Sequence, residues 1–227
     1  MARATAPGVA VGDLDRIASE VLSAFGARSA MRGYEDGHGS GPFPLSLSVC
    51  INDEASGACD PSRVIEHGDL VTADVAAELD GWYADAAVSW CVGGAAADPR
   101  RAALAAAAGL VAHAGVTSLT RSTSWAAALE RMHRTAEHCG VVILEGWCGH
   151  GIGRAMHERP ALPSRLRPGD PGRSANWGLS RQGAITIEPI IAWTQSDLVR
   201  DGWLDRTADG SDACFAERTV VLEPDHA

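Results

Sequence analysis

The sequence contains no lysine, so all 19 of its basic residues are arginine, and these stand against 29 aspartates and glutamates. The net charge of −10 repels phosphate backbones and argues against nucleic acid as a partner. Arginine as the sole strongly basic residue, together with abundant alanine, is typical of a GC-rich bacterial genome. The hydrophobic fraction of 46% and the charged fraction of 21% indicate an ordinary soluble globular chain.

The six cysteines include no C-x-x-C pair, which excludes a zinc ribbon or a thioredoxin-type motif. A signal peptide is not indicated either, because the short apolar run near the N-terminus is cut off by Asp13. We find no apolar run that reaches the roughly 20 residues of a membrane span. We therefore expect a cytoplasmic protein with reduced thiols and without a membrane partner.

The order of the predicted elements favours an α+β fold, because strands come in antiparallel pairs with helices between them. A chain of 227 residues is long enough for one large domain, and we expect a single domain over residues 1–227. The segment 159–183 is rich in proline, glycine and arginine, and it predicts a loop or lid. Helices are expected over 11–27 (capped by Asp13), 98–115 (opened by Asp98 and Pro99) and 122–140 (capped by Ser122 or Ser124), and strands over 43–53, 69–79, 82–94, 184–193 and 217–224.

Three carboxylates lie on strands where burial is costly, unless each one is paired or binds a metal: Asp74, Glu188 and Glu217. Asp85 follows Asp74 by eleven residues, across a turn predicted at Asp80-Gly81, so a hairpin places the two roughly opposite each other. Two carboxylates that close repel each other, and one takes up a proton unless a cation lies between them.

Each of these residues taken singly has a simpler explanation. A strand aspartate often faces water at an edge, Glu188 can end a strand before Pro189, and His150 can bond to the backbone in a glycine-rich turn. Taken together, the carboxylates and His150 supply five oxygen and imidazole groups. Such a set suits two divalent ions such as manganese, iron or cobalt, with zinc also possible.

The motifs around these residues resemble those of the type I methionine aminopeptidases and, more broadly, of the "pita-bread" metallopeptidases, from about Pro7 to Val221. The resemblance rests on "CGHGIGRAMHERP", "TIEP", "ERT" and "GDLVTADVAAELDGWYADAAVSWCVG". It implies two pseudo-symmetric α+β halves around a curved antiparallel sheet, with an N-terminus shorter than the family's. It also implies a dinuclear metal site with the ligands Asp74, Asp85, His150, Glu188 and Glu217, of which Asp85 and Glu217 bridge both ions.

The resemblance further implies hydrolysis that removes the N-terminal residue of a peptide or a related small substrate, with a metal-bridging hydroxide as the nucleophile. Glu188 would shuttle the proton, and His157 would hydrogen-bond the substrate or the tetrahedral intermediate. The substrate's first side chain would lie near Tyr34, Phe43 and Trp203.

The sequence departs from the family pattern mainly on the substrate side. A second substrate-contacting histidine of the family falls on Gly57, and Arg218 stands where the family has a histidine after the last ligand. Residues 37–43 resemble an insertion near the pocket. A helix missing before the first strand would expose apolar surface, which predicts a homodimer that covers it.

Two other functions stay open at this point. One is a metalloenzyme of the same fold with non-peptidase chemistry on a specialised secondary-metabolite substrate. The other is a binding module that has lost catalysis, although all five ligands are present. A serine hydrolase has still less support, because neither "GHGSG" nor "GLSRQ" matches the G-x-S-x-G pattern or its strand-to-helix context.

Overall fold

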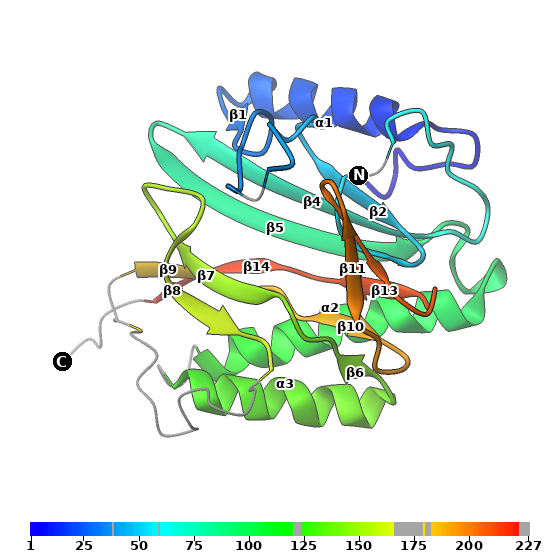
Figure 1. Cartoon of the computed structure of the whole chain (residues 1–227), viewed down its shortest axis with the longest axis vertical. Coiled ribbons are helices and arrows are strands. Elements are labelled where there is room, and N and C mark those ends of the chain that lie inside the picture. Colours follow the sequence, from blue (N-terminus) through cyan, green and yellow to red (C-terminus); the bar gives the residue numbers. More distant parts are fainter. Residues whose placement is uncertain (38, 59, 120–123, 166–178, 180–182, 223–227) are drawn as a thin grey trace.

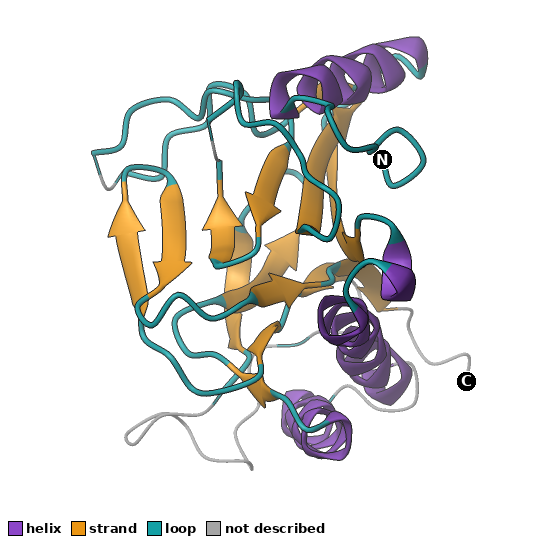
Figure 2. Cartoon of the chain, turned by 90° about the vertical axis from the view of Figure 1, so that its right-hand side faces the viewer, coloured by secondary structure: helices purple, strands orange, loops and turns teal. Residues whose placement is uncertain are grey.

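A computed structural model describes residues 1–37, 39–58, 60–119, 124–165, 179 and 183–222. Antiparallel sheets form the middle of the molecule, with one helix above them and two helices below them in the view of Figure 1. The same layers are visible from the side in Figure 2. The α+β class expected from the sequence is confirmed. The single domain over residues 1–227 stays a prediction.

The central feature is a long hairpin of β4 (Leu70–Leu79) and β5 (Trp82–Cys91), which pair along their whole length. Asp80 and Gly81 form the two-residue turn with φ of 54° and 77°. Positive φ at both positions matches the turn type that joins twisted strands most readily. The predicted turn is therefore confirmed.

The register of this hairpin differs by one step from the predicted one. Asp74 pairs with Ala87, and Asp85 pairs with Ala76, so the two carboxylates lie diagonally rather than opposite each other. The turn is centred between residues 80 and 81, one residue beyond the midpoint that would place them opposite. Because directly paired residues share a face and side chains alternate along a strand, both carboxylates still project from the same face.

The remaining strands form sheets around this hairpin. The first sheet adds β2 and β1 beside β4, and the backbone of Ala87 on β5 exchanges two hydrogen bonds with Glu217, at 3.0 and 3.3 Å. This contact joins the first sheet to a second sheet with the order β14-β9-β7-β8. The bounds are β1 Arg28–Ser29, β2 Ser48–Ile51, β3 Glu54–Gly57, β6 Val142–Ile143, β7 Cys148–Ile152, β8 Glu158–Pro163, β9 Gly183–Ile187, β10 Ile190–Ala192, β11 Leu198–Asp201, β12 Leu204–Thr207, β13 Ala213–Phe215 and β14 Arg218–Leu222.

Two predicted segments differ from the structure. The strand expected over 184–193 is split at Glu188 and Pro189 into β9 and β10, which belong to different sheets. The loop or lid expected over 159–183 begins instead as β8, paired with β7. Residues 166–178 and 180–182 of that segment lie outside the described residues.

Helix α1 (Val11–Ala24) lies on the outer face of the first sheet and buries Val11, Leu14 and Ala18 there. It begins two residues before Asp13, after Ala10, which makes no side-chain cap. The prediction of Asp13 as the cap is wrong, since this carboxylate stands in the first turn. The helix covers part of the face that we expected to be bare, although Phe25 beyond its end is 78% exposed.

The other two helices begin where the sequence predicts. Asp98 Oδ1 accepts hydrogen bonds from the backbone of Arg100 and Arg101 at the start of α2 (Pro99–Leu119). Ser124 caps α3 (Trp125–Cys139) through a bond from Ala127 N, and Gly140 ends it in the left-handed region at φ 69°. A short 3₁₀ helix, η1 (Gly94–Ala96), precedes α2.

Helix α2 is long and apolar enough, with a mean hydropathy of 1.6, to span a membrane by length and composition. The expectation that no segment reaches this length is therefore wrong. Its apolar side chains pack as a core helix: Leu104 and Val111 are fully buried together with Met132 of α3 and Ile187 of β9. Small alanines between them allow this close packing on several sides.

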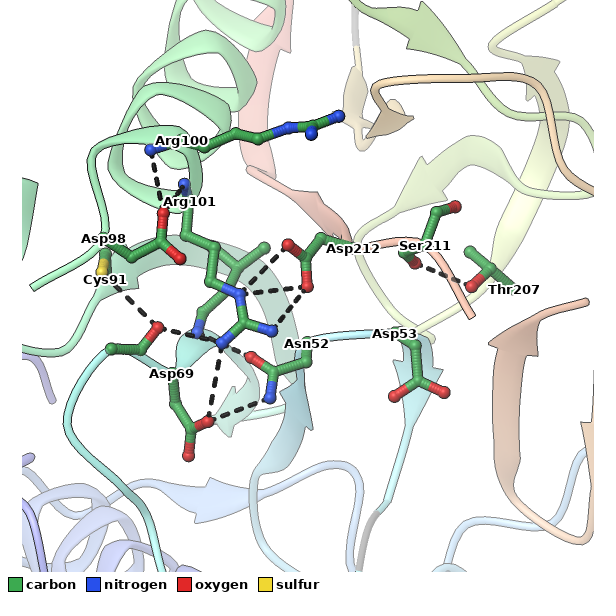
Figure 3. Close-up of polar contacts among 12 residues, drawn as sticks. Asn52, Asp53, Asp69, Cys91, Asp98, Arg100, Arg101, Thr207, Ser211 and Asp212 are labelled. Atoms are coloured by element: carbon green, nitrogen blue, oxygen red, sulfur yellow. Dashed lines mark hydrogen bonds and ion pairs between the residues drawn. The ribbon is translucent and has the colours of Figure 1, made fainter. Parts of the chain in front are cut away.

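A polar network around Arg101 fastens the start of α2 to the loops beneath it (Figure 3). The Arg101 guanidinium bonds Asp212 at 3.0–3.1 Å and the carbonyl of Gly68 at 3.1 Å. Asp69 lies 3.9 Å from the same guanidinium and accepts a bond from the Asn52 amide at 2.9 Å. The network fixes the segment just before β13, which leads to Glu217.

We expect Arg101→Met to lower the free energy of unfolding by about 1–3 kcal/mol, because Asp212 and Gly68 lose their charged donor while partly buried. Urea denaturation measures the loss. Arg100→Met is the matched control, since the Arg100 guanidinium only lies over the ring of Trp193, 5.3 Å from its centre. Equal losses in the two variants would contradict the role given to the network.

Candidate metal centre and substrate pocket

The five residues predicted as metal ligands gather at one place in the structure. Ligand atoms of Asp85, His150 and Glu217 all lie within 4.8 Å of one another, and the three residues are buried. Asp74 shares the sheet face of Asp85, and Glu188 Oε1 lies 3.5 Å from His150 Nε2. Segments far apart in the chain therefore converge on one small cluster.

The carboxylates on the first sheet are held against Glu217 by backbone contacts. Glu217 directly precedes β14, and its backbone bonds to Ala87, two residues from Asp85. The hydroxyl of Thr219 accepts a bond from the Asp85 amide at 2.9 Å and donates to the Asp85 carbonyl at 2.8 Å. These contacts fix the distance between Asp85 and Glu217 and leave the carboxylate oxygens of both residues unused.

His150 lies on β7 between two glycines whose lack of a side chain is required. A Cβ on Gly149 would lie 2.3 Å from the carbonyl oxygen of Thr186, and one on Gly151 would lie 2.2 Å from that of Arg159. The C-G-H-G-I-G core therefore allows β9 and β8 to approach β7 closely. This approach brings His150 to Glu188.

Hydrogen bonds orient both side chains of this half of the cluster. The Gly151 carbonyl lies 2.9 Å from His150 Nδ1, which points to an Nδ1–H donor and leaves Nε2 with a free lone pair. The Thr186 hydroxyl accepts a bond from His150 N at 3.1 Å and donates to Glu188 Oε1 at 3.2 Å. A neutral imidazole with Nε2 free is the form that binds a metal ion.

The electrostatics of the cluster indicate a missing positive charge. Burial, and then repulsion by neighbouring carboxylates, raises the pKa of Asp74 and of Glu217 well above the usual range, and burial raises the pKa of Asp85. One oxygen atom of each of these three residues is buried and has no hydrogen-bond partner among the described residues. Asp74 as a whole keeps partial exposure, but that oxygen does not.

A divalent cation removes this conflict, because carboxylate oxygens and one imidazole nitrogen are the donors that such ions accept. The orphaned oxygen atoms thus fit the metal that the resemblance implies. The fit concerns the side chains alone and does not decide which ion is bound.

The residues predicted for the substrate side lie beside this cluster. The ring of His157 lies 4.5 Å from the ring of His150, and its Nδ1 is 2.7 Å from the Tyr34 hydroxyl. The rings of Trp203 and Phe43 pack edge to face at 5.1 Å, and Tyr34 lies 6.4 Å from Trp203. The structure therefore brings together the whole predicted set and forms an aromatic wall next to the imidazoles.

The His157 ring is neutral at ordinary pH. Desolvation of the ring, and then the proximity of His150, lowers the pKa of His157 to about 4. The residue as a whole is nevertheless exposed.

The segment predicted as an insertion, residues 37–43, is attached to the turn that carries Trp203. The indole Nε1 of Trp203 donates to the Gly41 carbonyl at 3.0 Å, and the Ser40 hydroxyl donates to the Gly202 carbonyl at 2.9 Å. Ser40 and Gly41 therefore hold the turn that carries Trp203 in place, whereas the insertion itself stays a prediction.

Gly57 has no room for any side chain. Its φ is +106°, and a Cβ there would lie 1.6 Å from the carbonyl oxygen of Trp203. The reason is the pairing of β3 with β12, in which Gly57 pairs with Leu204. His67, the nearest histidine after Gly57 in the sequence, lies with its ring against Gly93, beyond the end of β5, and does not replace the family's histidine.

Arg218 does not place its charge in the cluster. Its guanidinium donates to the carbonyls of Ala87 and Glu217, at 2.9 and 2.6 Å, while the residue is exposed. It reinforces the junction between β5 and β14. Sequence reasoning missed this role and also missed the hydroxyls of Thr186 and Thr219. The sequence did contain a signal for the two threonines, because Thr186 lies two residues before Glu188 and Thr219 lies two residues after Glu217.

The fold and the cluster together define a class of protein, a hydrolytic metalloenzyme. The family model described as "Metallopeptidase family M24" matches residues 30–224. Methionine aminopeptidase 1 of Mycobacterium tuberculosis is 37% identical over 98% of this chain and 82% of its own. Methionine aminopeptidase of Aquifex aeolicus is 31% identical over 95% of this chain and 83% of its own.

Solved structures agree with these matches. A crystal structure of methionine aminopeptidase from Thermotoga maritima superposes with a TM-score of 0.83 and 25% identity, over 98% of this chain and 85% of that one. A prolidase from Pyrococcus horikoshii, 15% identical with a TM-score of 0.56 over 96% of this chain and 52% of its own, shares the fold alone. The chain belongs to metallopeptidase family M24 and has its pita-bread fold. It is a metal-dependent hydrolase of the aminopeptidase type, and the family implies divalent metal ions.

We expect Mn²⁺ or Co²⁺ at about 100 times the dissociation constant to add about 2.7 kcal/mol to folding. For a chain of this size that is a rise in melting temperature of roughly 5–10 °C. Glu217→Gln should abolish the rise and yet raise the melting temperature of the metal-free protein, because it relieves repulsion among buried carboxylates. Glu137→Gln, at an exposed position of α3, is the control and should change neither value. A metal-induced rise that survives in Glu217→Gln would contradict the site.

We expect Gly57→Ala to destabilise the fold by about 1–3 kcal/mol, since the new methyl group overlaps the Trp203 carbonyl and forces β3 from β12. Urea denaturation provides the measurement. Gly109→Ala is the matched control: it lies in α2 with no atom within 4 Å of the new Cβ, and the same methyl should stabilise the helix by about 0.5–1 kcal/mol. An unchanged free energy of unfolding in Gly57→Ala would contradict the prediction and show that β3 adapts to the new methyl group.

Proposed function

We propose that this protein is a dinuclear metal-dependent aminopeptidase that releases the N-terminal residue of short peptides. The observation that carries the proposal is the position of His157 and the aromatic wall directly beside the five-residue cluster. A metal site and apolar side chains beside it to hold the terminal residue are the two parts that hydrolysis of a terminal peptide bond requires. Two relatives with over 30% identity bear the name methionine aminopeptidase, which supports the same reaction class.

The cluster supplies enough ligands for two ions. The side chains that would hold the ions are those of Asp74, Asp85, His150, Glu188 and Glu217. Manganese, iron, cobalt or zinc suits these donors. When bound, such a pair of ions polarises a carbonyl and lowers the pKa of water to near neutrality.

The protein's own groups then handle the protons and the substrate. Glu188 accepts the proton of the attacking water and delivers it to the leaving amine, with the Thr186 hydroxyl orienting the carboxylate at 3.2 Å. His157 donates a hydrogen bond to the oxygen of the scissile carbonyl as negative charge develops there. Tyr34, Phe43 and Trp203 hold the first side chain of the substrate by apolar contact.

The substrate side has one imidazole where the family pattern has two. Loss of one donor to a developing oxyanion costs roughly 10²–10³-fold in rate. We infer that the protein serves a narrow substrate, a short peptide or a related small molecule, rather than the bulk of newly made chains.

A second candidate is non-peptidase chemistry by the same metal centre on a specialised small substrate. The observation in its favour is the β3–β12 pairing, which closes the place of the family's histidine with backbone. A binding module without catalysis has less support, because all five ligand side chains are present and close together.

The setting follows from the same features. We propose a bacterial cytoplasmic enzyme with neither nucleic acid nor a membrane as a partner, in line with the net charge of −10 and the buried packing of α2. A homodimer stays a prediction, and the part of the sheet that α1 covers is not available to it.

We expect His157→Ala to lower kcat/KM for peptide hydrolysis roughly 10²–10³-fold, with unchanged metal content. Release of N-terminal residues from a panel of methionyl and non-methionyl peptides measures the activity of the manganese- or cobalt-loaded protein. His113→Ala, at an exposed position of α2, is the control and should retain full activity. Bound metal without release of any residue from the panel would reject the aminopeptidase and favour the second candidate.

A further inference from the structure

His157 has two nitrogen atoms, and only one of them can face the substrate. The Tyr34 hydroxyl lies 2.7 Å from Nδ1, and the two rings meet edge to face at 5.1 Å. We propose that Tyr34 is a positioning residue, whose hydroxyl donates to Nδ1 and thereby holds His157 in the tautomer with the proton on Nε2. This inference rests on the proposed function, in which His157 acts as a hydrogen-bond donor.

Both groups can donate or accept in this bond, and we assign the direction from the surroundings of the phenol. A neutral imidazole has one donor nitrogen and one acceptor nitrogen, and a phenol can donate or accept. Burial, and then the charge of Asp36, raises the pKa of Tyr34, so the phenol keeps its proton. Among the described residues, the Tyr34 hydroxyl has no hydrogen-bond partner besides His157 Nδ1. If Nδ1 carried the proton instead, the phenol proton would lose this acceptor.

The phenol is held rigidly enough to select a tautomer. The backbone of Tyr34 bonds to Met31 and Phe43 at 2.8 Å each, and its ring lies 6.4 Å from that of Trp203. A hydrogen bond that a fixed partner makes to one ring nitrogen determines which nitrogen carries the proton.

The loop of His157 is fastened independently of Tyr34. Tyr83 N donates to the Gly153 carbonyl at 2.8 Å, and the Arg154 guanidinium lies over the Trp82 ring, 3.7 Å from its centre. Glu158 Oε1 accepts bonds from the backbone of Arg154 and Ala155 at 2.6 and 2.8 Å. Removal of the Tyr34 hydroxyl therefore changes the proton position on His157 and leaves the loop backbone in place.

The choice of tautomer on His157 matters more here than it would in a site with two imidazoles. Gly57 leaves no side chain to take over donation if His157 turns its bare nitrogen to the substrate. The rate then depends on the fraction of molecules in which Nε2 carries the proton.

The first test reads the tautomer directly, by nitrogen-15 NMR of the histidine side chains in the zinc-loaded protein near pH 7.5. His157→Ala identifies the His157 signals. We expect a bare Nδ1 and a protonated Nε2 in the wild type, and a mixture of both tautomers in Tyr34→Phe. A wild-type His157 protonated on Nδ1, or a tautomer unchanged in Tyr34→Phe, would overturn the proposal. This readout is informative even if no peptide is hydrolysed.

The second test separates positioning from apolar contact by kinetics. Tyr34→Phe should lower kcat roughly tenfold, the effect of one ordinary hydrogen bond, with KM within about twofold. The chain has two tyrosines, so Tyr83→Phe is the matched control and should leave both constants unchanged. In the His157→Ala background, Tyr34→Phe should have no further effect on kcat. A rise in KM alone, or an undiminished effect of Tyr34→Phe on kcat in that background, would show that Tyr34 only makes apolar contact with the substrate.

Discussion

The constraint that governs this structure is the repulsion among three carboxylates that lie close together in the interior. They come from β4, from β5 and from the residue before β14. Asp74, Asp85 and Glu217 each keep a buried oxygen without a hydrogen-bond partner among the described residues, and their shared burial raises all three pKa values. A protein chain does not adopt such an arrangement for stability, because an apolar residue at any of these positions would cost less. The cluster therefore fits a divalent cation, and contacts elsewhere in the molecule hold the carboxylates close together.

The frame that does so uses contacts other than the carboxylate oxygens. The backbone exchange between Ala87 and Glu217, the Thr219 hydroxyl on the Asp85 backbone, and the Arg218 guanidinium on two carbonyls lie on one junction between β5 and β14. Beneath it, α2 and α3 enclose a core that includes Ile187, the residue before Glu188. Because backbone and core contacts fix the candidate ligands, the atoms that stabilise the fold here differ from the carboxylate oxygens that would bind a metal ion.

The sequence sufficed for the parts of this arrangement that local rules govern. The hairpin turn at Asp80-Gly81 and the caps at Asp98 and Ser124 follow from turn chemistry and capping, and the cost of a carboxylate on a buried strand singled out Asp74, Glu188 and Glu217 as candidates for a shared site. The register was missed by one step because the two carboxylates were paired about the midpoint of their own separation rather than about the predicted turn at Asp80-Gly81. The strands β3 and β12 were missed because they are only four residues each and pair across a long stretch of sequence. The close packing of Gly57 on Trp203 depends on that pairing, so the sequence showed an absent histidine without its structural reason.

The pairing of β3 with β12 shows that the predicted metal side and the predicted substrate side of the site are built in different ways. The ligands come from strands and their ends, whereas Tyr34, Phe43 and His157 stand on loops that are fastened to one another and to the turn of Trp203. A wall built from loops can change shape without moving the carboxylate cluster. The β3–β12 pairing leaves no room for a side chain at Gly57, and it holds the turn of Trp203 in place at the same time. In the function that we propose, the substrate side therefore has the single imidazole of His157 as its hydrogen-bond donor, beside an aromatic wall that this pairing stabilises.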